Sequence, residues 1–276
     1  MSNIDEKIKI HVLHTGKVYV DEALPNRDVS RNPIAYTGIF RSLKRRVWIP
    51  ISVYLIEHPQ GLVLFDTGWH TEVRTNPIKH ETLLIWFSAK PMLPEGQSVN
   101  EQIKALGFKT SDLEYVFLSH LDVDHVSGVR LVKDAKNIMV SEEEKKAGDS
   151  RQLRYYKGFW DGVELKPFSW KKMNIGPEHQ GLDVFGDGKI LLVSTPGHSQ
   201  GSCSMMIQNH GKFVLLSGDN GYAKDSWEKM RLPGPVYDKT AMIKSLEWVL
   251  NMSKKKECME VLANHDLEVK PHIIEI

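Results

Sequence analysis

The sequence predicts an α/β protein, and three observations support that prediction. Short apolar runs with the length and composition of buried strands recur along the chain. Four of these runs end in Asp or His beside Gly or Pro, which places polar side chains at strand ends. An amphipathic helix is expected from Val236 to Met252, with Leu246, Val249 and Leu250 on one side. Because open α/β sheets bind ligands at the carboxyl ends of their strands, we expect a ligand site there.

Composition narrows the class of protein. The 276 residues are 41% hydrophobic and 26% charged, as in ordinary globular proteins, and we expect one domain spanning residues 1–276 with insertions. A net charge of +1 gives no reason to expect a nucleic acid or an anionic membrane as partner. Two cysteines, Cys203 and Cys258, are too few for a disulfide framework. The first seven residues lack the order of a signal peptide and no run reaches the length of a membrane span, so a cytoplasmic protein is expected.

The first half of the chain begins with predicted strands. Alternating apolar and polar residues from Lys7 to Val20 predict a strand with one wet face. A hairpin is expected next, with strands at 47–56 and 62–66 and a turn at Pro59-Gln60-Gly61. Its second strand delivers Asp66, and the glycine two residues later allows a sharp turn. Asp66 is therefore either a functional carboxylate or part of a surface turn.

An insertion is expected at about residues 69–100. It contains three prolines and the apolar patch 83–87, a composition typical of a lid or binding loop. The alternative is a short helix that closes the core or meets a partner subunit, which would make a homodimer. A helix from Ser98 to Leu106, ended by Gly107, follows the insertion.

The central motif is the segment 119–128, Ser-His-Leu-Asp-Val-Asp-His-Val-Ser-Gly. The apolar run Tyr115 to Leu118 precedes it and predicts a buried strand. Four of the next residues can bind a metal: His120, Asp122, Asp124 and His125. So many polar groups on a short loop would repel one another or stay unsatisfied if merely buried, whereas a divalent cation satisfies all of them. A polar surface loop rich in His and Asp is the alternative.

The second half of the chain alternates strands with turns. A strand at 137–140 and a helix starting at Ser141 are expected, followed by an aromatic, irregular segment at 151–181 that lines a pocket or packs in the core. Hairpins are expected at 183–193, around the Gly186-Asp187-Gly188 turn, and at 202–216, around the turn at 210–211. A last strand at 258–263 precedes His265. These strands end beside His198, Asp219 and His265.

The candidate residues at strand ends share the chemistry of metal ligands, and two divalent ions could bind among them. They are Asp66, His120, Asp122, Asp124, His125, His198, Asp219 and His265. The remaining histidines are expected to be surface or packing residues: His11, His14, His58, His70, His80, His179, His210 and His272.

The motifs HxxxDH, TPGHS, GD and a late strand ending in His follow one another in the order that resembles the metallo-β-lactamase superfamily. The resemblance extends from Val53 to Asp266. It implies a four-layer αββα sandwich with a metal site at one edge of two packed sheets. It also implies a first metal position at His120, residue 122 and His198, a second at Asp124, His125 and His265, a bridging Asp219, and an Asp66 that orients a ligand histidine.

One residue departs from the family pattern. The usual run is HxHxDH, whereas this chain has HLDVDH, with Asp122 in place of the second histidine. A carboxylate is a harder, anionic ligand, so iron or manganese become candidates beside zinc. The superfamily accepts a carboxylate here in its iron-containing oxidoreductase branch. Alternatively, Asp122 turns away and the first position is weak or empty.

The motifs are also similar to those of the N-acyl homoserine lactone lactonases, which carry a tyrosine three residues after the bridging aspartate. Tyr222 stands at that spacing from Asp219. A tyrosine hydroxyl beside two cations can donate a hydrogen bond to a carbonyl oxygen as it becomes an oxyanion. A tyrosine that merely packs under the loop is the alternative.

The predicted function is metal-assisted hydrolysis of a small-molecule lactone or ester. Water activated by the metals attacks the carbonyl carbon, Tyr222 polarises the carbonyl oxygen, and Asp124 or Asp219 handles the proton. The apolar patch 83–87 and the segment near Trp160 could receive an acyl chain.

Three alternatives stay open. They are a hydrolase of the same fold acting on a thioester, phosphodiester or sulfate ester, a redox protein of the iron branch, and a metal-binding protein without turnover. The redox class is disfavoured because the chain lacks a Gly-rich phosphate-binding loop for a flavin domain. A β-lactamase proper is disfavoured by the lack of a secretion signal.

Overall fold

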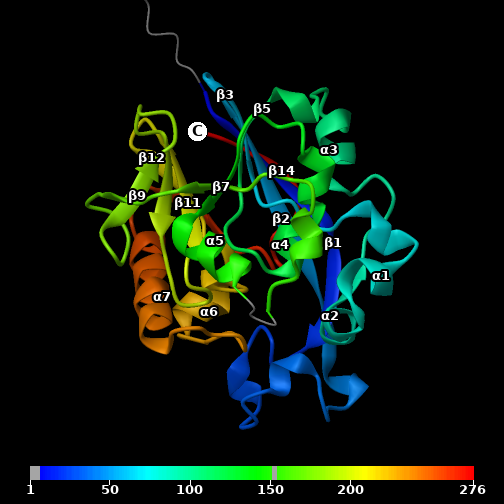
Figure 1. The fold of residues 1–276 in the computed structure, drawn as a ribbon. Coiled ribbons are helices and arrows are strands. Elements are labelled where there is room, and N and C mark those ends of the chain that lie inside the picture. Colours follow the sequence, from blue (N-terminus) through cyan, green and yellow to red (C-terminus); the bar gives the residue numbers. More distant parts are fainter. Residues whose placement is uncertain (1–6, 151–153) are drawn as a thin grey trace, which may run out of the picture.

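Two β-sheets pack face to face, and helices lie on both outer faces of the pair (Figure 1). The computed structural model describes residues 7–150 and 154–276. The strand order is β14-β1-β2-β3-β5-β6-β7 in the first sheet, where β4 also pairs with β1, and β13-β12-β11-β10-β9-β8 in the second. The αββα sandwich implied by the sequence resemblance is therefore confirmed. The prediction that the chain has no signal peptide rests on its first seven residues, and residues 1–6 lie outside the described part.

The first sheet contains the predicted strand near the amino terminus and the predicted hairpin. Strands β3, β5, β6 and β7 are parallel neighbours, so their carboxyl ends lie at one edge. The sequence analysis missed three short strands of this sheet, β4, β7 and β14. The strands are β1 (Lys9–Asp21), β2 (Arg46–His58), β3 (Gly61–Phe65), β4 (Lys90–Met92), β5 (Leu113–Phe117), β6 (Ile138–Ser141), β7 (Lys166–Phe168) and β14 (His272–Glu275).

The second sheet contains both hairpins predicted for the second half of the chain. Strand β9 ends at Asp183, earlier than predicted, because the Asp183 carboxylate accepts the backbone N–H groups of Gly186 and Gly188 and forms the turn. The strands are β8 (Lys171–Lys172), β9 (Gln180–Asp183), β10 (Ile190–Ser194), β11 (Cys203–Asn209), β12 (Lys212–Leu216) and β13 (Cys258–Leu262).

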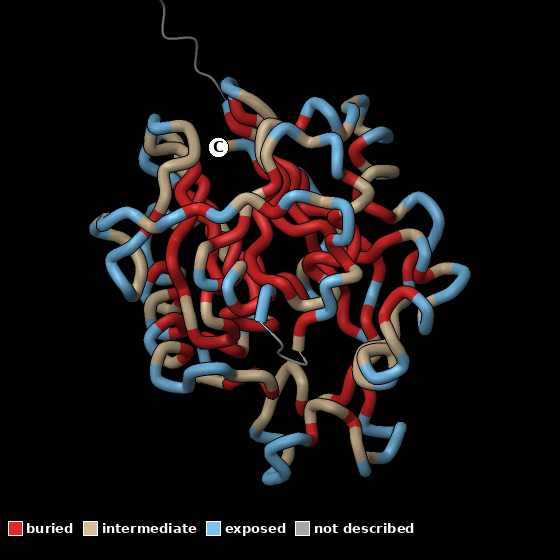
Figure 2. The backbone as a smooth tube through the Cα atoms, in the orientation of Figure 1, coloured by how far each residue is buried: buried red, intermediate tan, exposed pale blue. Residues whose placement is uncertain are grey.

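The main core lies between the two sheets. Ile10 and Phe65 from the first sheet are fully buried against Leu192 and Ile207 from the second. Figure 2 shows this region as the continuous buried centre of the molecule. Burial of these side chains away from water is the main driving force that holds the sheets together.

Helices close the outer faces of both sheets. Helix α3 (Val99–Ala105) packs on the first sheet through Ile103, together with the one-turn α4 (Val123–Val126) and α5 (Glu142–Asp149). Ser98 is the N-cap of α3, and its backbone N–H donates to Glu101 Oε2 at 3.0 Å. On the second sheet lie α6 (Lys224–Glu228) and α7 (Lys239–Ser253).

Helix α7 begins three residues later than the amphipathic pattern predicted. The Asp238 carboxylate accepts the backbone N–H groups of Thr240 and Ala241, so it caps the first turn. The buried side of α7 faces the sheet and consists of Met242, Leu246, Val249 and Met252. The segment before the cap is thereby left as a loop that reaches the site described below.

The region of the predicted insertion forms short elements. It contains α1 (Pro77–Glu81), α2 (Leu83–Ser88) and β4, which pairs with β1. Leu83 and Leu84 are 65% and 56% exposed, respectively, while Trp69 is fully buried. In the aromatic segment, whose residues 151–153 lie outside the described part, Phe159 and Trp160 are buried in the core, as the packing alternative requires. None of the described helices is long and apolar enough to cross a membrane.

Candidate metal centre

Five strand ends bring the predicted residues together at one edge of the sandwich. Asp66 follows β3, and His120 follows β5, with Asp124 and His125 in the short helix α4 that comes next. From the second sheet, His198 follows β10, Asp219 follows β12 and His265 follows β13. All of these side chains except Asp124, which is partly exposed, are nearly or fully buried.

Four histidines of this cluster share one arrangement. In each, Nδ1 is hydrogen-bonded to a neighbouring oxygen, so that Nε2 faces the other members of the cluster. The partners of Nδ1 are Ser119 Oγ for His120 (2.9 Å), an Asp66 oxygen for His125 (2.8 Å), the Pro235 carbonyl for His198 (3.0 Å) and the Pro50 carbonyl for His265 (2.8 Å). A tethered Nδ1 with a converging Nε2 is the geometry of imidazole metal ligands.

The second metal position, formed by Asp124, His125 and His265 with Asp219, fits a divalent ion. Asp219 Oδ1 lies 3.2 Å from His125 Nε2 and 3.3 Å from His265 Nε2. His265 Nε2 is also 3.5 Å from Asp124 Oδ2. Among the described residues, these two Nε2 atoms and Asp219 Oδ1 are buried without a hydrogen-bond partner. Such atoms are costly to bury unless a cation binds them.

The first metal position is formed by His120, residue 122 and His198 with Asp219, and here Asp122 lies close to both imidazoles. His120 Nε2 also lacks a hydrogen-bond partner within the described residues, and it lies 3.4 Å from Asp122 Oδ2 and 3.8 Å from Asp219 Oδ2. His198 Nε2 lies 3.0 Å from Asp122 Oδ2 and 3.6 Å from Asp219 Oδ2. Ligand atoms of His120, His198 and Asp219 all lie within 4.8 Å of one another.

Arg154 contacts the first position, and the sequence analysis did not foresee it. Its Nε donates to Asp122 Oδ1 and its Nη2 to Asp122 Oδ2, each at 2.6 Å. Nη2 also lies 2.8 Å from His198 Nε2, and Nη1 donates to the His198 carbonyl at 2.7 Å. In this arrangement the residues of the first position do not fit a metal, because a guanidinium already binds two of them.

Neighbouring charges shift the pKa values of Asp122, His198 and Asp219. Burial alone would raise the pKa of Asp122, but Arg154 and the two neighbouring imidazoles hold that pKa well below its usual range. Burial and the nearby Arg154 lower the pKa of His198, so its imidazole is neutral and Nε2 can accept a hydrogen bond. Burial likewise opposes ionisation of Asp219, yet His125 and His265 keep its pKa low.

Asp66 is hydrogen-bonded to the central motif at Ser119 and His125. Its Oδ1 accepts the Ser119 backbone N–H at 2.8 Å, and its Oδ2 accepts His125 Nδ1 and the Ser119 hydroxyl, each at 2.8 Å. Asn264 Nδ2 donates to the same Oδ2 at 3.1 Å. The Asp66 backbone has a left-handed φ of 64°, which an aspartate rarely adopts outside functional sites and turns. Asp66 thus makes the contact with His125, a candidate ligand, that the resemblance implied.

Glu144, in the first turn of the helix predicted to start at Ser141, is a second buried anchor. Its carboxylate accepts the Leu121 N–H (3.0 Å), the Tyr155 hydroxyl (2.9 Å), the Ser199 hydroxyl (2.7 Å) and the Gly201 N–H (3.0 Å). These contacts join the loop of His120 to the loop of His198. Glu142 and Glu143 stand beside it in the same first turn, so nothing in the sequence distinguishes Glu144 as the residue that joins the two loops.

Glu81, at the end of α1, is a buried acid near the centre. Burial, with a smaller contribution from the charge of Asp124, raises the pKa of Glu81 to about 9. Its carboxyl group is therefore protonated at neutral pH and adds no charge to the metal positions.

Tyr222 lies against the cluster, as the spacing predicted. Its ring stacks on that of His265 at 4.8 Å and meets the His198 ring edge-on at 6.1 Å. Burial and the charges of Asp219, Asp124 and Asp122 raise its pKa well above the usual value. The phenol therefore keeps its proton at neutral pH and can act as a hydrogen-bond donor.

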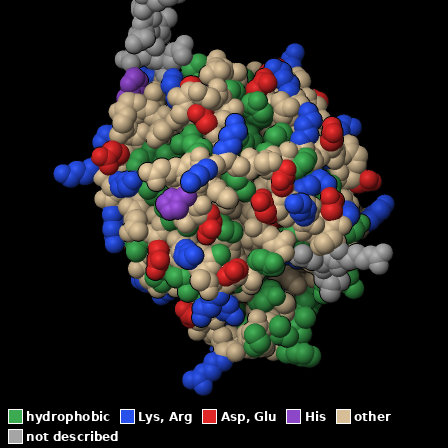
Figure 3. Space-filling model, turned by 60° about the vertical axis from the view of Figure 1, so that its left-hand side comes forward, with side chains coloured by type: hydrophobic (Ala, Val, Ile, Leu, Met, Phe, Trp, Pro, Cys, Tyr) green, Lys and Arg blue, Asp and Glu red, His purple; other side chains and the backbone are tan. Residues whose placement is uncertain are grey.

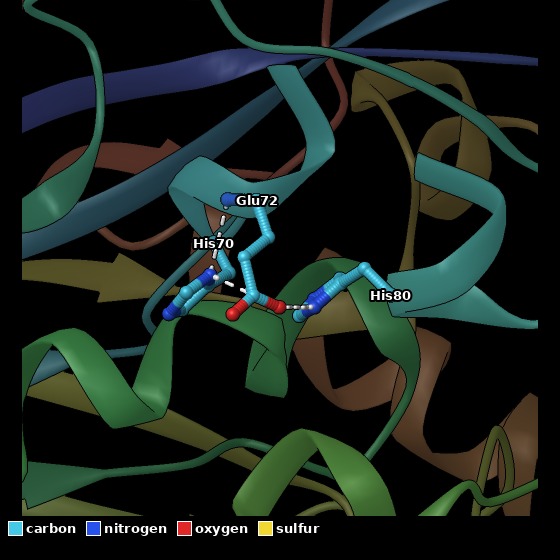
Figure 4. Close-up of side chains that lie close together, drawn as sticks. All are labelled: His70, Glu72 and His80. Atoms are coloured by element: carbon cyan, nitrogen blue, oxygen red, sulfur yellow. Dashed lines mark hydrogen bonds and ion pairs between the residues drawn. The ribbon is translucent and has the colours of Figure 1, made fainter. Parts of the chain in front are cut away.

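A separate cluster of His70, Glu72 and His80 has the composition of a metal site (Figure 4). His80 Nδ1 lies 2.8 Å from Glu72 Oε2, and Arg130 Nη2 donates to the same oxygen at 2.8 Å. His70 Nδ1 accepts the Glu72 backbone N–H at 3.1 Å, and His80 Nε2 is hydrogen-bonded to Ser127 at 2.8 Å. These hydrogen bonds give each member of the cluster a partner within the protein. Both histidines, expected from the sequence to be surface or packing residues, are buried.

Comparisons with known proteins agree with this geometry. Residues 46–259 match the model of the metallo-beta-lactamase superfamily. The N-acyl homoserine lactonase AttM of Rhizobium radiobacter is 32% identical over 225 residues, which cover 79% of this chain and 82% of that protein. The family match over most of the chain and the relative at this identity together establish the family of the chain. The chain belongs to the metallo-β-lactamase superfamily and is a hydrolase of that fold.

Solved structures share the same architecture. An N-acyl homoserine lactone hydrolase with the product N-hexanoyl-L-homoserine at its catalytic metal center has a TM-score of 0.75 at 23% identity, covering 94% of each chain. AidC, a dizinc quorum-quenching lactonase, has a TM-score of 0.64 at 15% identity, covering 98% of this chain and 94% of that one. At these identities the likeness shows the fold, which implies a centre for divalent metal ions.

Proposed function

We propose that this chain is a metal-dependent lactonase that opens the ring of N-acyl homoserine lactones, a quorum-quenching activity. The observation that carries the proposal is the pairing of a converging imidazole cluster with Tyr222, a buried and protonated phenol, at the same edge of the sandwich. The relative named as a lactonase at 32% identity supports the substrate class. A divalent ion bound there would supply a water acidified toward a pKa of about 7 and Lewis acidity toward the carbonyl.

The residues of the chain divide the remaining work. Tyr222 donates a hydrogen bond to the carbonyl oxygen as negative charge develops on it. Asp124 is the carboxylate placed to accept the proton of the attacking water, because its side chain is 15% exposed whereas that of Asp219 is 2% exposed. Asp219 instead contacts imidazoles of both positions and orders the ligand set.

Zinc is the metal we propose for the second position, since two imidazoles and two carboxylates suit it. Two ions per chain, as in the dizinc neighbour, would use the first position as well. Asp122 would there be an anionic ligand that widens the choice to iron or manganese. That second ion requires Arg154 to leave His198 Nε2.

A substrate panel tests the proposed activity. Purified protein should open N-hexanoyl-L-homoserine lactone, measured as base consumption at constant pH. Turnover should stop after chelation and return when zinc is added. A thioester, phosphodiester or sulfate ester turned over in place of the lactone would move the assignment to another hydrolase of this fold. Stoichiometric zinc with no turnover of any substrate would leave a metal-binding protein.

A homodimer and a cytoplasmic location belong to the same proposal. Figure 3 shows hydrophobic side chains gathered at the lower end of the molecule, the end where Figure 1 places the segment 22–45. Phe40 and Leu43 in this segment are 99% and 63% exposed, respectively, and Leu83 and Leu84 of α2 are also exposed. Light scattering of purified protein tests the dimer. Both cysteines are free, in agreement with a reducing compartment.

A further inference from the structure

We propose that the guanidinium of Arg154 holds the first metal position as a cation built into the chain. The protein then binds one divalent ion tightly, at the second position, and a further ion only by displacing Arg154. The proposal rests on the hydrogen bonds of two residues, His198 and Asp122. It concerns the number of bound ions and does not depend on which substrate is hydrolysed.

The hydrogen bonds of His198 leave no electron pair for a metal. Nδ1 donates to the Pro235 carbonyl at 3.0 Å, which leaves Nε2 as the ring atom that can present a lone pair to a donor. Arg154 Nη2 lies 2.8 Å from that Nε2 and can only donate. A single lone pair cannot accept a hydrogen bond from Arg154 and bind an ion at the same time.

Asp122 is held in the same way by a fork of two hydrogen bonds. Both carboxylate oxygens accept from Arg154 at 2.6 Å, the bidentate geometry that guanidinium and carboxylate form best. A third bond, from Nη1 to the His198 carbonyl at 2.7 Å, fixes the guanidinium in place. An incoming ion has to break this partly buried pair, which leaves Arg154 without its partner unless the side chain leaves the site.

The departure from the family motif and the presence of Arg154 are then one feature. Replacing the usual histidine by Asp122 adds a negative charge to the first position. Arg154 adds one positive charge that compensates it, with its side chain 22% exposed. The pair is neutral, and it keeps a permanent cation within hydrogen-bond distance of His198 Nε2.

The second position has no such occupant within the described part of the chain. The Nε2 atoms of His125 and His265 and Oδ1 of Asp219 are buried there without hydrogen-bond partners. No Lys or Arg among the described residues forms an ion pair with Asp124 or Asp219. An ion can therefore bind at the second position without displacing another charged group.

Zinc titration of chelator-stripped protein tests the proposal, with competition against a chromophoric chelator to read both affinities. The wild type should bind one tight equivalent of zinc, and a second roughly a hundredfold more weakly or not at all. Arg154→Ala should strengthen the second equivalent by roughly tenfold or more, because His198 Nε2 is released. Arg154→Lys, which keeps the charge but not the fork, should fall between the two and serves if the alanine variant does not fold.

Arg41→Ala is the matched control. Arg41 forms a similar bidentate pair with the buried Asp21, at 3.0 and 2.9 Å, far from the metal ligands in the sequence. Its loss should lower stability without changing the zinc count. Two equivalents of equal affinity in the wild type would overturn the proposal, and so would an Arg154→Ala protein that binds zinc as the wild type does. Zinc counting involves no lactone, so failure of the proposed activity would be seen separately.

Discussion

The two metal positions share Asp219, and each includes two tethered histidines, yet they differ in what neutralises them. At the second position, buried nitrogen and oxygen atoms face one another without partners among the described residues. At the first, Arg154 already binds Asp122 and His198. The difference teaches that a ligand motif determines where the side chains converge, whereas a residue distant in the sequence decides whether an ion can bind there.

The largest expected effect separates the two positions directly. His125→Ala removes a ligand of the second position and should abolish tight zinc binding and lower lactone hydrolysis on the order of a thousandfold. His120→Ala removes a ligand of the first position and should retain the tight equivalent. Zinc counting by atomic absorption and the initial rate of hydrolysis give both values, with circular dichroism as the check on folding. The reverse pattern would mean that the tight ion lies at the first position.

Tyr222→Phe isolates the hydrogen bond from the metal. The ring still packs on His265, but the donor is lost, so kcat should fall by roughly a hundredfold while the zinc content stays the same. Steady-state kinetics of lactone hydrolysis measure the change. An unchanged kcat would identify Tyr222 as a packing residue, which is the alternative that the sequence left open.

Asp66→Asn tests the support of the second position. The amide cannot replace the carboxylate acceptor of His125 Nδ1 and the Ser119 groups together, so zinc affinity should fall by about 10- to 100-fold. Competition with a chromophoric chelator measures it. If zinc affinity at the second position stayed unchanged, the orientation of His125 would have to come from its other neighbours.

The smallest expected effect concerns the Arg74–Glu101 pair, an arginine–carboxylate pair outside the metal positions. Glu101 accepts two hydrogen bonds from Arg74, at 2.9 and 2.6 Å, which lower the pKa of Glu101 to about 2. A lowered pKa stabilises the folded state above the unfolded pKa of about 4.5, and this contribution is lost as the pH falls from about 4.5 to 2.

Because the Glu101 side chain is 33% exposed, screening by solvent reduces the contribution to about 1–2 kcal/mol. Glu101→Gln should therefore lower the free energy of unfolding by that amount at pH 7, and should match the wild type near pH 2. Urea unfolding at both pH values measures it. An equal deficit at both pH values would show that the variant acts through packing or helix capping.

Strand patterns and turn residues predicted most of the fold. Alternation and apolar runs located the long strands, and Asp or His after each run located the edge where they meet. The edge where the candidate residues gather could be predicted because each lies on the loop or short helix that follows a strand, as His198 and His265 do. Short elements were missed because they carry too few residues for a pattern: β14, for example, has four residues and is held by its pairing with β1.

Two residues at the site, Arg154 and Glu144, could not be predicted from the sequence for a different reason. Arg154 stands 32 positions after Asp122, in an irregular segment whose composition indicates aromatic side chains that line a pocket or pack in the core. Glu144 looks like an ordinary acidic residue at a helix start, and only the approach of the 199–201 loop makes it a buried anchor. Such contacts join segments that no local spacing connects, so they required the structure.

Anomalous scattering at the zinc edge from crystals of the zinc-loaded protein locates the bound ion. We expect a strong peak among His125, His265, Asp124 and Asp219, with Arg154 still bound to Asp122. A peak only at the first position, with Arg154 displaced, would contradict the account. So would a peak at His70, Glu72 and His80 in place of the sandwich edge.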